Sequence, residues 1–320
     1  MAETGRTPIS ELLWRAWGAL GVSSWVGQVD AVVDPEVLIA LTAELGDERL
    51  YLETVDWGIL HASLLMPGRL RRLAARAGVE QRVGAWIATV ASLSSSVAWK
   101  MNAHAPLEDF EPSRKSHSFI GTDAARPGIA ALRWRSVLGT SVRSEVLRSF
   151  HPVVRGRVSS LASSDIIDDV GATKTQVNHV LDDLVDAGLV EREGSVRRRR
   201  YVPVVTARDP LANALWSSWQ TYPHAPWKAA IELLPLLAHA MEPADASAKP
   251  VSAAIDAHRA FTQALPLLQG FDRELAGPVA TGAAQLVAAE VRDRAWAASE
   301  AVAGMLAGGD DPRSHRHDQM

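Results

Sequence analysis

One stretch of the sequence, residues 140–205, constrains the fold more than any other because it sets the order of several elements at once. Its apolar residues predict an amphipathic helix over Ser141–Ser149. A second, short helix follows, with Ser163-Ser164-Asp165 as its capping residues. Gly171-Ala172 then predicts a tight turn. The segment therefore opens with two helices and a glycine turn.

A third helix and two strands complete this segment. Thr173 is a good N-cap for a helix over Lys174–Ala187, whose apolar residues recur at helical spacing and predict one buried face. Gly188 is suited to end that helix. The candidate strands are Leu189–Arg192 and Arg199–Val204, joined by a short glycine-containing turn. The predicted order is helix, helix, glycine turn, helix and β-hairpin.

This order resembles the bacterial winged-helix regulators of the ArsR and MarR type, most clearly in the string ATKTQVNHVLDDLVDAGLVEREGSVRRRRYV. The resemblance covers about 65 of the 320 residues. In those families a recognition helix enters the major groove of double-stranded DNA and a hairpin wing touches the adjacent backbone. The implied fold is mainly α, with helical N- and C-terminal regions around a central winged helix-turn-helix that carries a small β-hairpin wing.

Polar side chains cluster at the start of the third helix, where a recognition helix reads bases. Asn and Gln can pair with adenine edges, Lys with guanine, and Thr with the thymine methyl group or a phosphate. The candidate DNA-binding residues of the helix are Thr173, Lys174, Thr175, Gln176, Asn178 and His179. Asp182, Asp183 and Asp186 follow in the second half and would repel phosphate, so we expect only the first half to approach DNA.

Arginines dominate the predicted hairpin. The candidate contacts there are Arg192, Arg197, Arg198, Arg199 and Arg200. Alternate residues of a strand face opposite ways, so at most about half of the arginines in a strand would face the DNA. This limit does not apply at the tip of the hairpin, where the strand alternation ends. Arginines at such a tip would contact phosphates or lie in the minor groove, where the negative potential is greatest.

The charge distribution also favours a nucleic-acid partner for this segment. Residues 133–208 hold 13 Lys and Arg against nine Asp and Glu, a net charge of +4. The whole chain carries −4, which leaves −8 for the remainder. A basic module is thus expected inside an acidic protein.

Outside this module the sequence indicates helical regions with distinct roles. We expect a helical domain over residues 1–105, a linker or long loop over 106–130, and the winged helix-turn-helix over 131–208. A C-terminal helical region over 209–306 would serve dimerisation or partner binding, and 307–320 would be a disordered tail. The Ala-rich helix at Gly277–Leu306 is the best candidate for a dimer contact because small side chains permit close packing.

Enzymatic function classes find no support in the sequence. There is no cysteine, P-loop, dinucleotide fingerprint or GxSxG motif, so we expect no catalysis and no cofactor. His315 and His317 lie in the polar tail and would make a poor metal site, so none is expected. Residues 1–8 lack the features of a signal peptide, and no window reaches about 18 uninterrupted apolar residues. These features predict a soluble, cytoplasmic protein with no membrane partner.

The leading hypothesis is a sequence-specific, double-stranded DNA-binding transcriptional regulator that acts as a homodimer. A small-molecule effector or a partner protein would contact the helical regions. The alternatives are a winged-helix protein-interaction module and an antitoxin-like protein that binds a partner protein.

The sequence shows four further features, two of which have competing interpretations. The start of a helix at Asp34-Pro35-Glu36 is indicated by an N-cap, a proline and a first-turn acid. Core filling is the favoured explanation of the eleven tryptophans, and a ligand pocket or helix-dimer contact built from Trp216, Trp219 and Trp227 is the alternative. The arginines at positions 69, 71, 72 and 76 are explained either by a solvated helix face or by a second contact with DNA. Arg133 and Arg135, which flank Trp134, could reach backbone phosphates.

Overall fold

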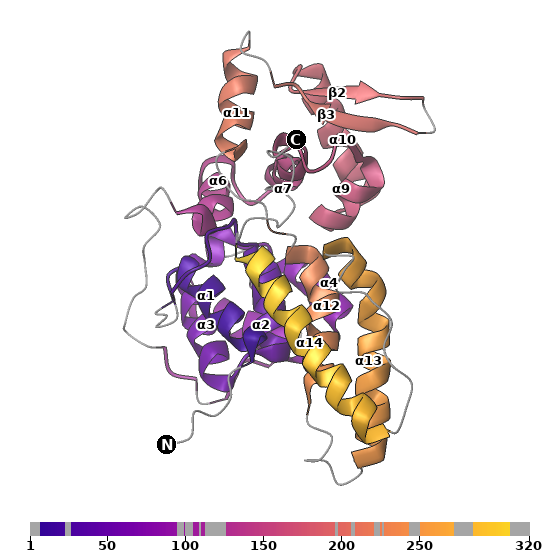
Figure 1. Ribbon diagram of the computed structural model, residues 1–320. Helices are drawn as coiled ribbons and strands as arrows, with labels where there is room; N and C mark the ends of the chain where they lie inside the picture. The colour runs from indigo at the N-terminus through magenta and orange to yellow at the C-terminus, as the bar shows by residue number, and fades with distance from the viewer. Residues whose placement is uncertain are drawn as a thin grey trace.

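A computed structural model shows a mainly helical chain with one small antiparallel sheet (Figure 1). It describes residues 7–22, 27–94, 99, 105–108, 110–112, 126–195, 198–205, 209–220, 225, 227–242, 250–271 and 284–307, without the side chains of 218–220, 250, 270, 271 and 284–288. The predicted tail beyond Ala307 and most of the predicted linker lie outside these ranges. Two clusters of buried apolar side chains divide the described chain into two packed units.

The helical unit combines both ends of the chain. Its elements are α1 (Pro8–Ala19), α2 (Pro35–Leu45), α3 (Glu48–His61), α4 (Pro67–Ala77), α5 (Glu80–Leu93), α12 (Trp227–Met241), α13 (Pro250–Phe271) and α14 (Ala284–Leu306), with the 3-10 turns η1 (Ala62–Leu64) and η3 (Pro127–Ile129). Residues 1–105 and 209–306 were expected to form separate regions, whereas in the structure α12 packs on α2 and α4, and α14 packs on α1. Ala295 and Ala298 of α14 are buried in this shared core, so one side of the Ala-rich helix packs within the chain, while Ala297 and Gly304 are exposed.

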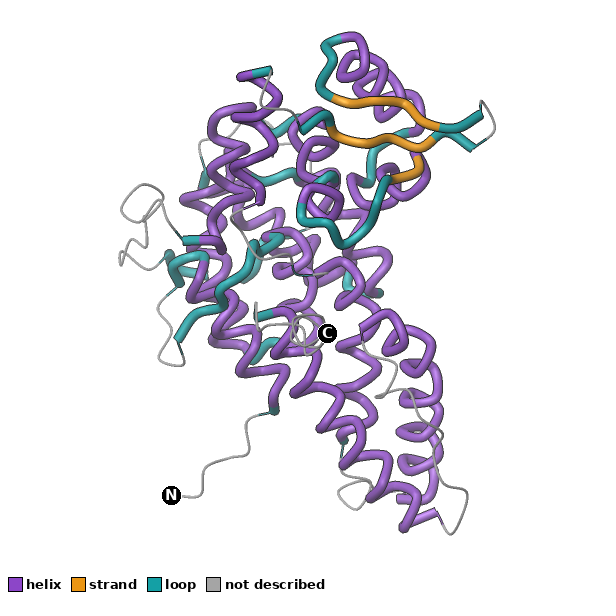
Figure 2. Tube along the Cα trace, turned by 45° about the horizontal axis from the view of Figure 1, so that its top comes forward, coloured by secondary structure: helices purple, strands orange, loops and turns teal. Residues whose placement is uncertain are grey.

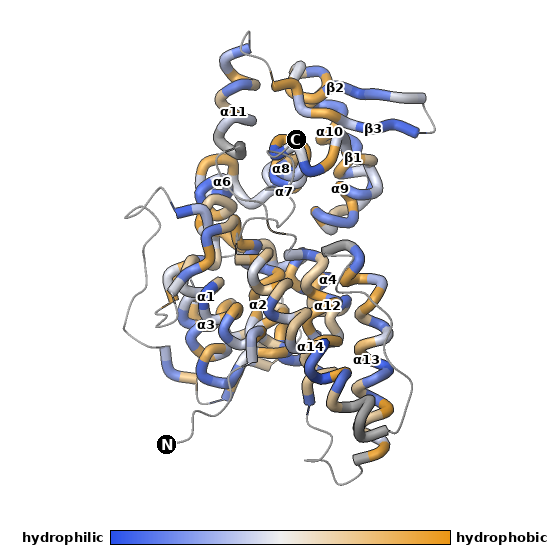
Figure 3. Tube along the Cα trace, viewed as in Figure 1, coloured by the Kyte–Doolittle hydropathy of each residue, from blue (hydrophilic) through white to orange (hydrophobic). Residues whose placement is uncertain are grey.

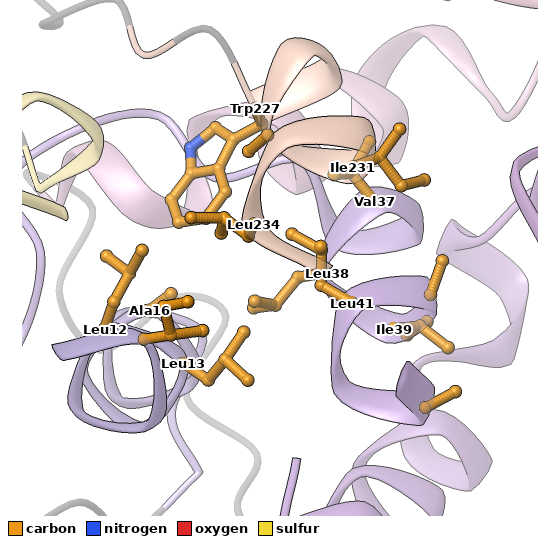
Figure 4. Packing of buried hydrophobic residues seen from close by; sticks show 14 of the residues in the cluster. Leu12, Leu13, Ala16, Val37, Leu38, Ile39, Leu41, Trp227, Ile231 and Leu234 are labelled. Atoms are coloured by element: carbon orange, nitrogen blue, oxygen red, sulfur yellow. The ribbon is translucent and has the colours of Figure 1, made fainter. Parts of the chain in front are cut away.

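Figure 4 shows how α1, α2 and α12 meet in this core. Leu12 and Leu13 of α1 approach Leu38 and Leu41 of α2, and Leu234 of α12 lies between the two helices. The helix starts follow the expected chemistry: the carboxylate of Asp34 accepts the backbone N–H of Val37, and Pro35 occupies the first turn.

Tryptophans fill much of the same core, each with its indole N–H bonded. Trp17 donates to Thr42 Oγ1 at 2.7 Å, Trp57 to the Leu20 carbonyl at 2.9 Å, and Trp227 to the Val32 carbonyl at 2.8 Å. Trp216 instead belongs to the other core, and the side chain of Trp219 is not described. The two described members of the predicted tryptophan group therefore serve as core residues of different units.

The sheet unit holds the segment that the sequence analysis singled out. Its elements are α6 (Ala130–Leu138), α7 (Val142–Ser149), α8 (His151–Val154), β1 (Leu161–Ala162), α9 (Ser163–Val170), α10 (Lys174–Asp186), β2 (Val190–Glu193), β3 (Arg200–Pro203) and α11 (Pro210–Gln220). The sheet order is β1-β3-β2, with Val190 opposite Pro203 and Leu161 opposite Tyr201. Figure 2 shows the hairpin of β2 and β3 extending away from the helices.

The predicted helix order and the hairpin are present, with small differences at the boundaries. Gly171 between α9 and α10 has φ +65°, the left-handed conformation that favours glycine. The cap of α9 is Ala162, whose N–H is accepted by Asp165 at 2.9 Å. The short strand β1 was not predicted, and α11, assigned to the C-terminal region by sequence, packs through Ala212 and Trp216 into the sheet unit.

Buried charges join the two units. Arg135 of α6 reaches Glu36 of α2 with both terminal nitrogens, at 2.7 and 2.8 Å, and its Nε donates to Glu145 of α7 at 2.8 Å. Arg69 of α4 makes two 2.6 Å bonds to Asp34 and a third bond to Glu36 at 3.0 Å. The side chains of Glu36, Arg69, Arg135 and Glu145 are each no more than 1% exposed.

Arg148 of α7 extends these contacts toward α9, donating to Glu145 and to Asp169, both at 2.9 Å. We call Asp34, Glu36, Arg69, Arg135, Glu145, Arg148 and Asp169 together the ion network. The suggestion that Arg69 or Arg135 contacts DNA is wrong, because both guanidinium groups are buried and paired with carboxylates. A charge is tolerated in such a place only when a partner compensates for the lost hydration.

The network requires its acids to stay ionised. Burial alone would raise the pKa of Glu145, but Arg135 and Arg148 outweigh it and hold that pKa at about 2, below its ordinary value of 4.5. The pKa of Asp34 is likewise far below its ordinary value, because the pull of Arg69 and Arg148 exceeds the effect of burial. Both carboxylates thus favour the folded state through their charge.

We expect Arg135→Met to lower the free energy of unfolding by about 3–5 kcal/mol, because it leaves Glu36 and Glu145 buried with fewer partners. Urea unfolding of the full chain measures this loss. Arg259→Ala is the control because its pair with Asp256 is exposed, and it should cost less than about 1 kcal/mol. Equal, small losses for both variants would contradict a structural role for the network.

The pH dependence of stability follows from Glu145. Its folded pKa lies below its unfolded pKa, so the unfolded state binds more protons, and stability present above about pH 4.5 is lost as pH falls toward about 2. Urea unfolding across this range should show a shallower acid loss for Glu145→Gln than for the wild type. The exposed residue Glu48 provides the control, since Glu48→Gln should keep the wild-type slope. Parallel wild-type and Glu145→Gln curves would refute this assignment.

Candidate nucleic-acid interface

The start of α10 presents a polar face to solvent. Thr173, Lys174, Thr175, Gln176 and His179 are exposed, and Asn178 is half-buried. On the opposite face, Val177, Val180, Leu181 and Leu184 are buried in the core of the sheet unit. The six predicted residues thus lie together at the start of α10, and the helical period places them on a different side from the buried apolar residues.

Three of these six residues take part in local structure. Thr173 accepts the backbone N–H of Gln176 at 3.3 Å, and the Gln176 carboxamide oxygen accepts the backbone N–H of Thr173 at 3.2 Å, which is a capping box. Asn178 accepts a hydrogen bond from Ser163 at the start of α9, at 2.7 Å. The two amides expected to read adenine therefore have partners within the chain.

Lys174, Thr175 and His179 differ in this respect. Within the described ranges, none of their side chains makes a hydrogen bond or ion pair. Their polar atoms are available to an external partner at no cost in internal bonds.

The acidic second half of α10 is matched by arginines. Asp182 pairs with Arg192 of β2, and Asp183 pairs with Arg143 of α7. Arg192 also lies over the ring of Tyr201, 5.9 Å from its centroid. These pairs reduce the repulsion that the sequence predicted, and they also engage Arg192, which the sequence predicted to contact DNA.

The hairpin arginines fall into two kinds. Arg200 is held by Ser160, through bonds of 2.6 Å to the hydroxyl and 2.7 Å to the carbonyl. Arg198 and Arg199 are exposed and, as far as the described chain reaches, have no side-chain partner. The predicted contact Arg197 lies outside the described residues.

Contacts of the described hairpin backbone help to set the position of Arg198. The backbone N–H of Arg198 donates to the Ser195 carbonyl at 2.9 Å, and Gly194 has φ +80°. A Cβ at Gly194 would lie 2.6 Å from the Arg198 carbonyl oxygen, so glycine is required there. Hydrophilic residues run along the outer part of the hairpin in Figure 3.

A cation from the helical unit adjoins the start of α10. The guanidinium of Arg72 on α4 lies against Gly171, where an added Cβ would be 2.8 Å from Nε. Burial lowers the pKa of Arg72, and the nearby charge of Arg69 lowers it further. No hydrogen bond or ion pair of Arg72 is present among the residues that the structure covers. An external anion could therefore pair with Arg72. Arg76, on the same helix, instead pairs with Glu232.

Other site types find little in the described chain. None of its groups of three or more His, Asp or Glu side chains is placed to hold a metal ion. None of its helices is both long and apolar enough to cross a membrane. No protein-family model, curated protein or solved structure proved significantly similar to this chain.

The capping role of Gln176 separates local stability from any external contact. We expect Gln176→Ala to lower the free energy of unfolding by about 0.5–1 kcal/mol, because the N–H of Thr173 loses its acceptor. Thr175→Ala, one position earlier and without a partner, should change it by less than about 0.5 kcal/mol. Thermal and urea unfolding of both variants measure the difference. A loss in Thr175→Ala as large as that in Gln176→Ala would show that the bonding pattern at this helix start is wrong.

Proposed function

We propose that the sheet unit is a winged helix-turn-helix that binds double-stranded DNA, and that the protein is a transcriptional regulator. The observation that carries this proposal is the joint presence, on one small unit, of two exposed polar groups whose side chains have no partner among the described residues. These are Lys174, Thr175 and His179 at the start of α10, and Arg198 and Arg199 on the hairpin. Either feature alone is common on a solvated surface. Together they match the two contacts that such a unit makes with DNA.

The reading contacts fall to the unpaired side chains of α10. Lys174 can donate to guanine, and Thr175 can contact a thymine methyl group or a phosphate. His179, one turn later, can donate or accept at a base edge. The amide oxygens of Gln176 and Asn178 already accept bonds from Thr173 and Ser163, so these two residues are secondary candidates for base contacts.

The positioning contacts fall to cations that have no partner among the described residues. Arg198 and Arg199 at the hairpin would bind phosphates or enter the minor groove. Arg72 would add a phosphate contact from the helical unit beside the start of α10. Since one short recognition helix supplies limited specificity, a homodimer on a symmetric site completes the proposal.

The salt dependence of DNA binding tests the positioning contacts. Fluorescence anisotropy with DNA from upstream of the gene and with a scrambled duplex gives Kd at several salt concentrations. Each neutralised phosphate adds about 0.9 to the slope of log Kd against log salt, so Arg198→Ala/Arg199→Ala should reduce it by up to about 1.8 for both duplexes. Arg49→Ala/Arg82→Ala removes the same charge from α3 and α5 and should leave the slope unchanged.

The same titration tests the reading contacts. Thr175→Ala/His179→Ala should abolish the preference for the upstream duplex while leaving the Kd for the scrambled duplex nearly unchanged. Absence of binding to either duplex at low salt would refute DNA binding. The sheet unit would then be a protein-interaction module, the antitoxin-like alternative included.

A further inference from the structure

A cavity of about 310 Å³ is lined by residues of both units. Seven of its lining residues come from the helical unit and its connections, and seven from the sheet unit. The former include Val32, Trp227 and Lys228, and the latter include Pro152 and Leu161. The volume falls in the range of sites for small molecules, and a ligand there would contact both units.

Most charged groups around this cavity already have partners in the chain. Asp34 is bonded twice to Arg69, and Asp169 accepts from Arg148. Asp165 accepts the backbone N–H of Ala162. Because these carboxylates already have partners, they are poorly suited to bind a cationic ligand.

Lys228 is the exception. Its half-buried ammonium has no hydrogen bond or ion pair among the described residues. Burial lowers its pKa, and the attraction of Asp169 offsets this only in part. Lys228 and Ala229 also belong to the first turn of α12, whose backbone N–H groups lack intrahelical acceptors and favour negative charge.

The rest of the wall suits an apolar group. Val32, Leu161, Pro152 and Trp227 contribute hydrocarbon surface, and the indole of Trp227 is fixed by its bond to the Val32 carbonyl. A ligand can therefore place a charge at Lys228 and an apolar part against these side chains.

We propose that this cavity binds a small organic anion, a carboxylate or phosphate on an apolar group, with Lys228 as its counter-ion. Because the cavity is lined by both units, its occupant favours the relative placement of the units that best fits it. The bound anion would then be an effector that changes DNA affinity, a role that rests on the proposed function.

Isothermal titration of the DNA-free full chain with benzoate and phenyl phosphate tests the site, with benzylamine and benzyl alcohol as cationic and neutral counterparts. We expect at least one of the two anions to bind the wild type, and Lys228→Met to weaken it at least about tenfold. Lys228→Arg keeps the charge and should retain binding. No binding of either anion, equal binding by Lys228→Met, or preferred binding of benzylamine would overturn the proposal.

The effector role has its own measurement. The bound anion should shift the Kd for upstream DNA in the wild type but not in Lys228→Met. Anion binding with no shift in Kd would leave the site standing and overturn its effector role. Anion binding in a protein that binds no duplex would instead mean that the proposed function has failed while the site holds.

Discussion

The buried ion network is the interaction on which the arrangement of the two units depends. Asp34, Glu36 and Arg69 belong to the helical unit, and Arg135, Glu145 and Arg148 to the sheet unit. Hydrophobic contact could join the units in many orientations, because it is non-directional. Bidentate bonds between guanidinium and carboxylate groups form in only a few orientations, so the network holds the sheet unit in one orientation on the helical unit.

This junction links the proposed interface to the rest of the chain. Arg148 and Asp169 belong to the network and also line the cavity, while Arg72 extends from α4 to the turn before α10. Any ligand or partner that moves one unit must work against these contacts. The helical unit is thus placed to influence the proposed DNA binding, and the chain folds back so that its N-terminal and C-terminal helices build that unit together.

Patterns within short windows made the sheet unit predictable. The helix periods, the Thr173 cap, the Gly171 turn and the hairpin all depend on residues close in sequence. The ion network could not be predicted in this way, because Glu36 and Arg135 are 99 positions apart in the sequence. Glutamate and arginine are also residue types that usually lie at the surface. The shared core of α1, α2 and α12 was missed for the same reason. In the candidate site, exposure was predictable for most helix residues, but the bonds that occupy Gln176, Asn178, Arg192 and Arg200 were not.

The central claim is that the start of α10 and the hairpin together contact DNA. Hydrogen exchange of the full chain, measured by mass spectrometry with and without upstream duplex, tests it directly. The account predicts slower exchange in peptides that cover Thr173–His179 and the hairpin arginines, with no change in α3 and α5. Unchanged exchange in both segments under conditions where the duplex is bound, or slowing confined to the helical unit, would contradict it.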